Sequence, residues 1–339
     1  MRHLLIPVLT LVMLMGGTSC SLNFGGSSGS KSYTSTISGK QGDVLVVINN
    51  DYWDSDLGQT IRDSLTAEYP MLPQSEPYFR VSNVPHNGFT TMFQIQRNIV
   101  RVSIGPENAN KVTYRKNVWA TPQCVVEVKA DSYKNAEELF KKNAANIRNA
   151  IEDAERERII SNNKAYSSPA TEYEVQKLFG GSPIFPKGAK VFNQTEDFIW
   201  IAITNTDYIK KYIILYKYPV EKGVEMMGRE SLIENNLEAI KANIQSTREG
   251  SYMTHSKYLE PSLKYLKYKD KRLAELRGLW DVENDYMGGP FITHVVYSPD
   301  GKYMIGIEGF VFAPKHDKIQ HLRDVEAIVY SFNWTGSEN

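Results

Sequence analysis

The chain has 339 residues, and its 39 basic and 39 acidic side chains give a formal net charge of zero at pH 7. This balance excludes the strongly basic surface of a dedicated nucleic-acid-binding protein, so nucleic acid is not expected as a partner. The length is ample for a hydrophobic core. The chain has only two cysteines, Cys20 and Cys124. If Cys20 is modified, no disulfide can form within the chain, and the fold must be held by that core.

The first 19 residues have the three parts of an export signal. Arg2 and His3 form a short basic segment, residues 4–15 are mainly apolar, and residues 16–19 are small. The apolar segment is shorter than the roughly 20 residues that span a bilayer. It therefore predicts a cleaved signal peptide rather than a membrane-spanning helix.

Cys20 directly follows this segment. A run of small residues that ends in cysteine resembles the lipobox of bacterial lipoproteins. The resemblance implies cleavage between Ser19 and Cys20 and acylation of the Cys20 thiol, which anchors the protein to a lipid bilayer. The alternative is a conventional signal peptide that happens to be followed by a cysteine.

Residues 20–40 are predicted to be the lipidated cysteine and a flexible tether. Thirteen of residues 21–40 are Ser, Gly or Thr, and such a segment buries too little apolar surface to fold. No acidic cluster follows Cys20, which favours a location in the cell envelope with the folded body in the periplasm.

The N-terminal half of the body, residues 41–168, alternates between strand and helix patterns. Strands are predicted at 44–48, 89–96, 99–104, 112–119 and 123–129. The first strand is followed by a helix with an apolar stripe at Leu57, Ile61 and Leu65. Asp131 or Ser132 then caps a long helix that extends to about residue 160. Cys124 alternates with Val126 and Val128 in the last strand, which predicts a buried, unreactive thiol.

The C-terminal half, residues 169–339, repeats this order of elements. Strands are predicted at 198–203, 211–218, 280–283, 291–297 and 303–312. One helix has an apolar stripe at Ile233, Leu237, Ile240 and Ile244, and a final helix has one at Ile319, Leu322, Val325 and Val329. Asp300-Gly301 marks a tight hairpin turn.

These patterns predict an α+β fold with two α/β-type subdomains. Each subdomain is expected to have mainly antiparallel strands packed against amphipathic helices. Because each half runs from strands to a closing helix, the order of elements is compatible with an old duplication.

Several phrases in the sequence point to one family. They are GLWDV at 278–282, MGGPF at 287–291, EGFVFAP at 308–314 and RDVEAIVY at 323–330. Together they resemble a Bacteroidetes lipoprotein family catalogued as domain of unknown function 4837, and the similarity extends from about Asp43 to Phe332. The resemblance implies an envelope lipoprotein, and it implies no activity.

The first candidate site is the polar stretch of Asn49, Asn50, Asp51 and Trp53 at the carboxyl end of a buried strand. Ligands bind in such places in α/β sheets, and a tryptophan beside polar groups suits a sugar or a peptide. The alternative is a polar turn with a core tryptophan.

Glu308 and Trp280 are the other ligand-binding candidates. Glu308 lies inside an apolar strand, and a buried carboxylate needs a partner or a raised pKa. The alternative is a structural hydrogen bond. Asp281, Glu283 and Asp285 alternate, so they could line one strand face and bind a cation, or else form a solvated face. A hydrolase built around Glu308 would use the same carboxylates. The basic and aromatic segment 264–272 is a candidate for contact with anionic lipid headgroups, or else a solvated edge.

The sequence contains no H-E-x-x-H, paired C-x-x-C, complete P-loop or G-x-G-x-x-G motif. No catalytic residue, metal or cofactor is therefore predicted. The favoured hypothesis is a membrane-anchored periplasmic lipoprotein that binds an envelope protein, a glycan or another ligand without catalysis. The alternatives are an envelope hydrolase that uses carboxylates near Glu308 and Asp281, and a structural assembly factor.

Overall fold

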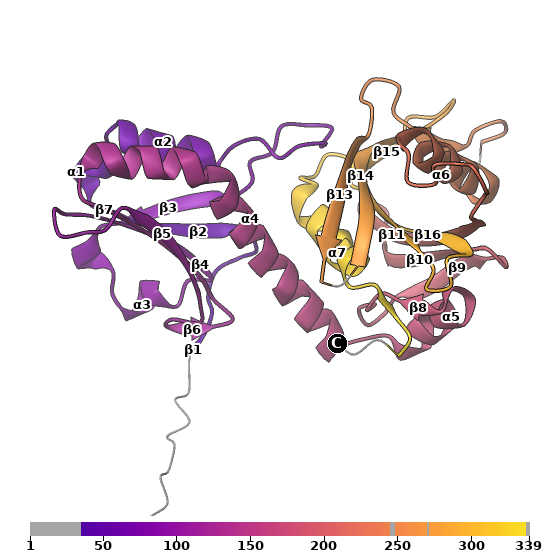
Figure 1. The fold of residues 1–339 in the computed structure, drawn as a ribbon, viewed down its shortest axis with the longest axis horizontal. Coiled ribbons are helices and arrows are strands. Elements are labelled where there is room, and N and C mark those ends of the chain that lie inside the picture. The colour runs from indigo at the N-terminus through magenta and orange to yellow at the C-terminus, as the bar shows by residue number, and fades with distance from the viewer. Residues whose placement is uncertain (1–34, 245–247, 270, 337–339) are drawn as a thin grey trace, which may run out of the picture. The chain divides into compact units, whose positions relative to one another are not determined.

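The computed structural model describes residues 35–244, 248–269 and 271–336 (Figure 1). The predicted signal peptide and Cys20 lie outside these residues. Among the described residues, no helix combines the length and the apolar composition needed to span a bilayer. Residues 34–339 form one compact unit, which contains two large β-sheets.

The N-terminal part, residues 35–165, is built on a five-stranded sheet. The strand order is β3 (Arg80–Val84), β2 (Asp43–Val47), β4 (Asn98–Ile104), β7 (Cys124–Ala130) and β5 (Lys111–Lys116). All neighbours are parallel except β5, which runs antiparallel to β7. The prediction of mainly antiparallel strands is wrong here. The buried apolar run of β2 is the pattern of a parallel strand that is covered on both faces.

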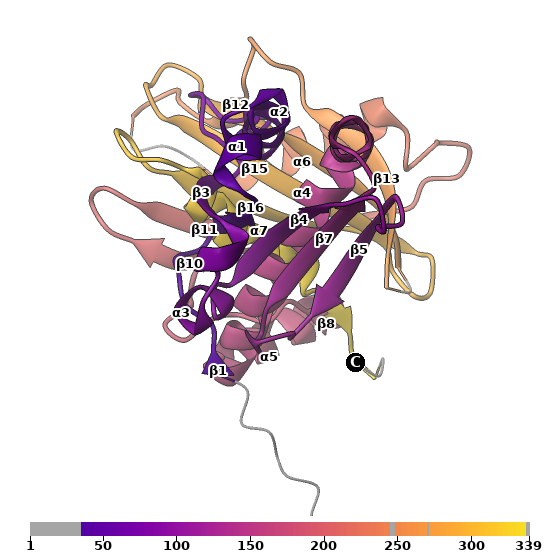
Figure 2. The same ribbon diagram turned by 90° about the vertical axis from the view of Figure 1, so that its left-hand side faces the viewer.

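Helices cover the two faces of this sheet. The helices α2 (Asp56–Leu65) and α4 (Tyr133–Ala165) pack on one face, as Figure 2 shows. The predicted stripe of α2 is confirmed, since Leu57, Ile61 and Leu65 are fully buried. Cys124 is also buried, and burial raises the pKa of its thiol to about 11, as expected of an unreactive cysteine.

The prediction of a strand at residues 89–96 is wrong. These residues follow a short 3-10 helix (His86–Gly88) and contain α3 (Thr91–Gln94). The chain must cross from β3 over β2 to reach β4 in a parallel direction, and such a crossover cannot be a hairpin. Phe89 and Phe93 pack on the second face of the sheet instead.

The C-terminal part, residues 166–336, is built on an eight-stranded sheet in which the neighbouring strands are antiparallel. The strand order is β12 (Met253–His255), β14 (Lys271–Val282), β15 (Gly288–Tyr297), β16 (Tyr303–Phe312), β11 (Lys210–Pro219), β10 (Phe198–Asn205) and β9 (Lys190–Gln194), and β13 (Ser262–Tyr268) also pairs with β14. The predicted hairpin at Asp300-Gly301 is confirmed, because Gly301 joins β15 to β16 with a φ of 70°.

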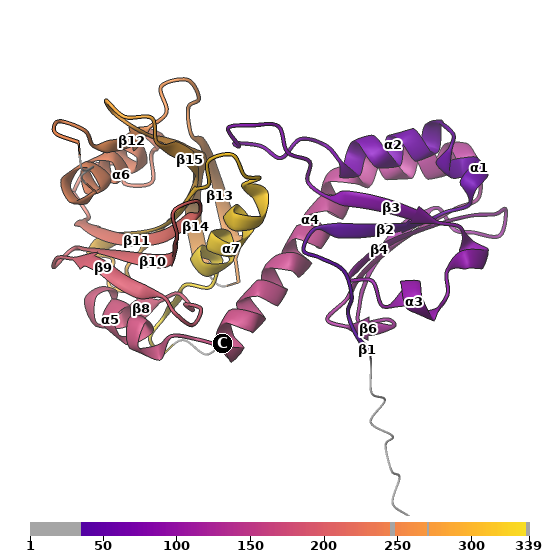
Figure 3. The same cartoon turned by 180° about the vertical axis from the view of Figure 1, so that it is seen from behind.

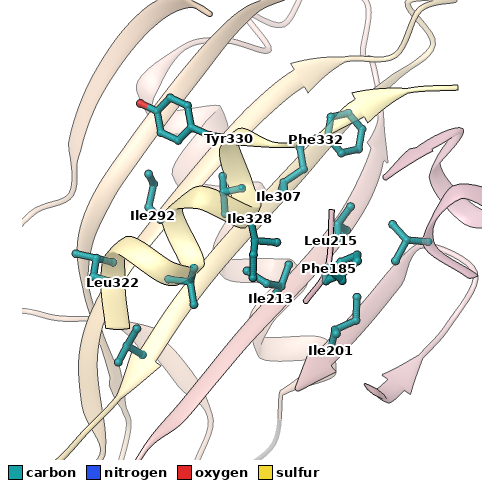
Figure 4. Close-up of a cluster of buried hydrophobic side chains, with 14 of the residues drawn as sticks. Phe185, Ile201, Ile213, Leu215, Ile292, Ile307, Leu322, Ile328, Tyr330 and Phe332 are labelled. Carbon is teal, nitrogen blue, oxygen red and sulfur yellow. The ribbon is translucent and has the colours of Figure 1, made fainter. Parts of the chain in front are cut away.

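Each face of this sheet has its own core. The helix α7 (Ile319–Tyr330) packs on one face, where Ile213, Leu215, Ile292 and Ile307 are fully buried beneath it (Figure 4). The helix α6 (Arg229–Asn243) packs on the opposite face (Figure 3). The strands are therefore apolar on both sides. The helix α5 (Pro169–Phe179) adds Val175 and Phe179 to the α7 core.

The short remaining elements complete the fold. They are β1 (Ser35–Thr36), which pairs with β6 (Ala120–Thr121), β8 (Gly181–Ser182), which pairs with β17 (Asn333–Trp334), and the single-turn helix α1 (Asn50–Trp53). The mixed α+β class is confirmed. Duplication of one unit would leave two sheets with the same strand order and direction. The two sheets differ in strand number, order and direction, so the fold does not support a duplication.

Candidate functional site

The first predicted site lies at the carboxyl end of β2. The chain leaves β2 for β3 on one side, and β4 lies on the other, so this is a switch point of the sheet, where ligands bind in open parallel sheets. Asn49 accepts a hydrogen bond from the backbone N–H of His86 at 3.3 Å. Asn50 and Asp51 are exposed. Their side chains are free to reach a partner in solution.

Trp53 ends the short helix α1 and is half-buried. The guanidinium group of Arg62 lies 4.7 Å from the centre of its ring and donates to its carbonyl oxygen at 2.7 Å. Trp53 also packs against the core between the sheet and α2. The ring is therefore held by contacts within the protein.

Glu308 lies in the middle of β16, on the face covered by α6, and is 1% exposed. Its Oε2 accepts hydrogen bonds from Nδ2 of Asn236 at 2.6 Å and from Oγ1 of Thr293 at 2.7 Å. Asn236 also donates to the hydroxyl oxygen of Tyr216 at 3.0 Å, and its Oδ1 lies 2.7 Å from Nε2 of His255. We call these five residues the Glu308 network.

Burial controls the charges in this network. It raises the pKa of the Glu308 carboxyl group to about 7, even though the hydrogen bonds from Thr293 and Asn236 act in the opposite direction. Burial also lowers the pKa of His255 to about 4. Both groups are thus largely uncharged below neutral pH and above pH 4. The network is a set of polar groups closed within the core.

Trp280 lies on the same face of the sheet as Glu308. It is 4% exposed, and its Nε1 donates to the carbonyl oxygen of Val311 at 3.1 Å. The ring packs edge-on against Phe310, with 5.6 Å between the ring centres. These contacts make it part of the core under α6.

The pairing of Glu308 with Asp281 is wrong. Glu308 is level with Thr293 and, on the next strand, with Leu276. Asp281 stands five residues beyond Leu276 along β14, which is about 17 Å at ~3.4 Å per residue. Because side chains alternate, Asp281 also points to the opposite face from Leu276. Catalytic carboxylate pairs lie within about 10 Å, so these residues form no such pair.

A cavity of about 340 Å³ lies on the α7 side of the eight-stranded sheet. It is enclosed by α4, α7, the strands β13 and β14, and the segment 69–78. Its lining residues are Tyr69, Pro70, Tyr78, Asn149, Glu152, Asp153, Arg156, Lys264, Leu266, Lys267, Tyr268, Glu275, Arg277, Glu326 and Tyr330. We call it the tyrosine cavity, because four tyrosines line it.

Buried ion pairs form the floor of the tyrosine cavity. Glu326 accepts hydrogen bonds from Arg156 at 2.8 Å, from Arg277 at 3.0 Å and from the Tyr69 hydroxyl at 3.3 Å. Burial by itself raises the pKa of Glu326, but the two guanidinium groups outweigh burial and hold the pKa at about 2. Glu326 is therefore ionised at neutral pH, and its carboxylate oxygens already accept hydrogen bonds from three side chains.

The carboxylate of Glu275 also has several hydrogen-bond partners. It accepts hydrogen bonds from Arg277 at 2.7 Å and from the Tyr330 hydroxyl at 2.7 Å, and Nε2 of His294 lies 3.2 Å from it. The pKa of Glu275 is lowered, because Arg277 and His294 outweigh the effect of burial. A carboxylate with this many donors is a poor general base, so the floor of the cavity is suited to binding rather than to proton transfer.

The free groups of the cavity lie at its rim. Lys264 and Lys267 are exposed on β13, and neither forms an ion pair with a described residue. Tyr268 is half-buried, and its ring packs edge-on against Tyr330 at 4.8 Å. The rim therefore offers cationic groups and an aromatic side chain above a fixed floor.

Sequence reasoning missed this cavity, because its residues come from five separate segments. One sign was present. Glu326 stands between Val325 and Ala327 in the final helix, inside an otherwise apolar stretch, as Glu308 does in β16. A buried charge indicates a nearby partner of opposite charge, but the sequence does not say which residue that partner is.

Comparison with protein families supports the resemblance inferred from the sequence. Residues 167–331 match the family described as Domain of unknown function (DUF4837). The match is narrower than the predicted extent of Asp43 to Phe332. Residues 37–164 match a different family, described as Domain of unknown function (DUF8532). The DUF4837 region thus corresponds to the eight-stranded sheet, and the tyrosine cavity takes residues from both matched regions.

The other comparisons are distant. No curated protein matches the chain. A crystal structure from Bacteroides thetaiotaomicron VPI-5482 is similar with 10% identity and a TM-score of 0.26, and the match covers 47% of this chain and 47% of that one. The human StarD13 (DLC2) lipid transfer and protein localization domain is similar with 14% identity and a TM-score of 0.22, over 49% of this chain and 95% of that one.

Proposed function

We propose that the protein is a lipoprotein anchored in the bacterial envelope through Cys20, with its body in the periplasm, and that it binds a small polar ligand in the tyrosine cavity without catalysis. The observation that carries the proposal is the state of the cavity floor. Its carboxylates already accept hydrogen bonds from arginine, tyrosine and histidine side chains. The floor is preorganised, and it has no free acid or base.

The charges on the wall indicate the type of ligand. Four cationic side chains, Arg156, Arg277, Lys264 and Lys267, stand against four carboxylates, Glu152, Asp153, Glu275 and Glu326. A balanced wall favours a ligand without a large net charge, such as a neutral sugar or a zwitterionic short peptide. The cavity volume of about 340 Å³ lies within the range of small-molecule sites. The tyrosine rings can pack against a sugar ring or an apolar side chain.

The test asks whether the purified protein retains a small molecule and whether that molecule lies in the tyrosine cavity. The mature lipoprotein is purified from envelopes, and small molecules released by denaturation are identified by mass spectrometry. Thermal unfolding is then followed with monosaccharides and dipeptides. Tyr268→Ala removes a ring from the cavity and should abolish the retained molecule and the thermal shift.

Tyr265→Ala is the matched control. Tyr265 lies three residues away on β13, is 63% exposed and does not line the cavity. Loss of the ligand in both variants would contradict the assignment to the tyrosine cavity. Recovery of no small molecule, together with capture of an envelope protein after crosslinking, would favour a structural assembly factor.

A further inference from the structure

A second cavity lies where the described chain begins. It has a volume of about 460 Å³, and its wall includes Ile37, Gln41, Arg97, Arg158 and Lys211. It is distinct from the tyrosine cavity, with which it shares no lining residue. We call it the tether cavity, because Ile37 belongs to the predicted tether, residues 20–40, and Gln41 directly follows it.

The position of the tether cavity places it close to the membrane if Cys20 is acylated, which is part of the proposed function. Only residues 21–34 separate Cys20 from Ser35, the first described residue. A chain of this length reaches about 50 Å at most. Ile37 and Gln41 are thus the lining residues nearest to Cys20 along the chain.

The charges around this cavity favour an anion. Glu155 pairs with Arg97 at 2.5 Å and with Arg158 at 3.2 Å, and Asp324 pairs with Lys211 at 2.9 Å. Three cations therefore share two carboxylates, which leaves one positive charge. Glu155 is 1% exposed and does not line the cavity, whereas Asp324 lines it and is paired with Lys211.

Two hydrogen-bond donors of this wall lack an acceptor. Nε of Arg97 and Nε2 of Gln41 are buried and have no partner among the described residues. A buried donor without a partner is costly, so the Arg97 and Gln41 side chains would gain by turning these donors toward an oxygen-rich anion in the cavity. Beside these donors, Ile159, Ile203 and Ile328 form an apolar wall. The cavity thus combines an anion-binding end with an apolar side.

We propose that the tether cavity binds the phosphate headgroup of an anionic membrane lipid, and so seats the body on the bilayer to which Cys20 is attached. The phosphate oxygens accept hydrogen bonds from Lys211, Arg97 and Gln41. The glycerol and the first methylene groups lie along the isoleucines. A phosphate suits this site because charge-assisted hydrogen bonds to its oxygens are stronger than neutral ones.

The experiment uses the mature chain with Cys20→Ser, so that no covalent lipid contributes. Flotation with vesicles of phosphatidylglycerol and phosphatidylcholine is compared with flotation on phosphatidylcholine alone. We expect binding to the anionic vesicles only. Lys211→Met should weaken it by about fivefold or more, since hydrogen bonds to charged groups are the stronger class.

Lys217→Met is the matched control. Lys217 lies on the same strand, pairs with Asp197 at 3.3 Å and does not line the cavity, so this variant should bind like the parent chain. Asn162→Glu adds a negative charge at the exposed rim of the cavity and should weaken binding without touching the buried ion pairs. Circular dichroism confirms that each variant is folded.

Equal binding by the Lys211 and Lys217 variants would overturn the assignment to this cavity. Binding of inorganic phosphate as tightly as of the anionic vesicles would overturn the lipid as the ligand. Neither result bears on the proposed function, because neither acylation of Cys20 nor the tyrosine cavity enters this assay. Conversely, an unmodified thiol on the natural protein would remove the anchor and leave vesicle binding to be judged by itself.

Discussion

Replacing Glu308 with glutamine should change how the stability of the protein depends on pH. Glutamine has the shape of the protonated carboxyl group, and its oxygen can accept the same bonds from Asn236 and Thr293. Unlike the acid, it cannot ionise. The native chain must ionise a group that is 1% exposed as the pH rises, and the Glu308→Gln variant does not.

The magnitude follows from the two pKa values of Glu308. The carboxyl group has a pKa of about 7 in the folded chain and an ordinary value of 4.5. A raised carboxyl pKa stabilises the fold below the unfolded value, and this contribution is lost as the pH rises through the folded value. Integrated from pH 5 to pH 8 at ~1.4 kcal/mol per pKa unit, the loss is about 2.5 kcal/mol.

The assay is urea unfolding of both chains at several pH values. The free energy of unfolding of Glu308→Gln, relative to the native chain, should rise by about 2.5 kcal/mol from pH 5 to pH 8. The titration of His255 occurs in both chains and cancels. Glu238→Gln, on the exposed side of α6, controls for the change in net charge. Parallel stability curves for the native and Glu308→Gln chains would refute the reasoning.

Three further outcomes are expected. Cys124 should not react with a thiol reagent at pH 7 until the chain unfolds, since burial raises its pKa to about 11; labelling of the folded Cys20→Ser chain would contradict this. Gly306→Ala should destabilise the fold by about 1–3 kcal/mol in urea unfolding, because its Cβ would stand 2.1 Å from Cζ of Tyr216; unchanged stability would show that the core repacks. Glu326→Ala removes the buried carboxylate that Arg156 and Arg277 share and leaves them with Asp153 and Glu275 alone, so the free energy of unfolding should fall by about 3 kcal/mol, and a loss below 1 kcal/mol would contradict the buried ion pairs.

Local patterns were enough to find most of the helices and strands. Leu57, Ile61 and Leu65 repeat at the spacing of one helical face, and all three are buried. The apolar residues around Glu308 predicted a strand with a buried carboxylate, and Glu308 lies in β16 and is 1% exposed. Such predictions succeed because the side-chain period is a property of the backbone and needs no distant partner.

The prediction made strand β14 too short, which shows where reasoning from local patterns fails. Residues 280–283 were expected to be a strand, but the strand runs from Lys271 to Val282. Its first half carries Glu275 and Arg277, which no predicted strand or helix included. In the fold they meet His294, Tyr330 and Glu326 on the α7 face of the sheet.

The candidate sites divide in the same way. Sequence alone identified Glu308 as a buried acid, but not its partner Asn236, which stands on the buried face of α6 between Leu232 and Ile240 at spacings of four. That spacing can be recognised in the sequence. The choice of Asn236 as the donor to Glu308 depends on how α6 lies across the sheet, 72 residues away along the chain.

The sequence by itself determined the mixed α+β class, the apolar faces and the inert Cys124, because each depends on neighbours within a few residues. Only the tertiary structure decided the parallel direction of β2, β3, β4 and β7, the separation of Asp281 from Glu308, and both cavities. Strand pairing and ion pairing join segments that are distant in the chain, and their free energy depends on which surfaces meet rather than on any local pattern.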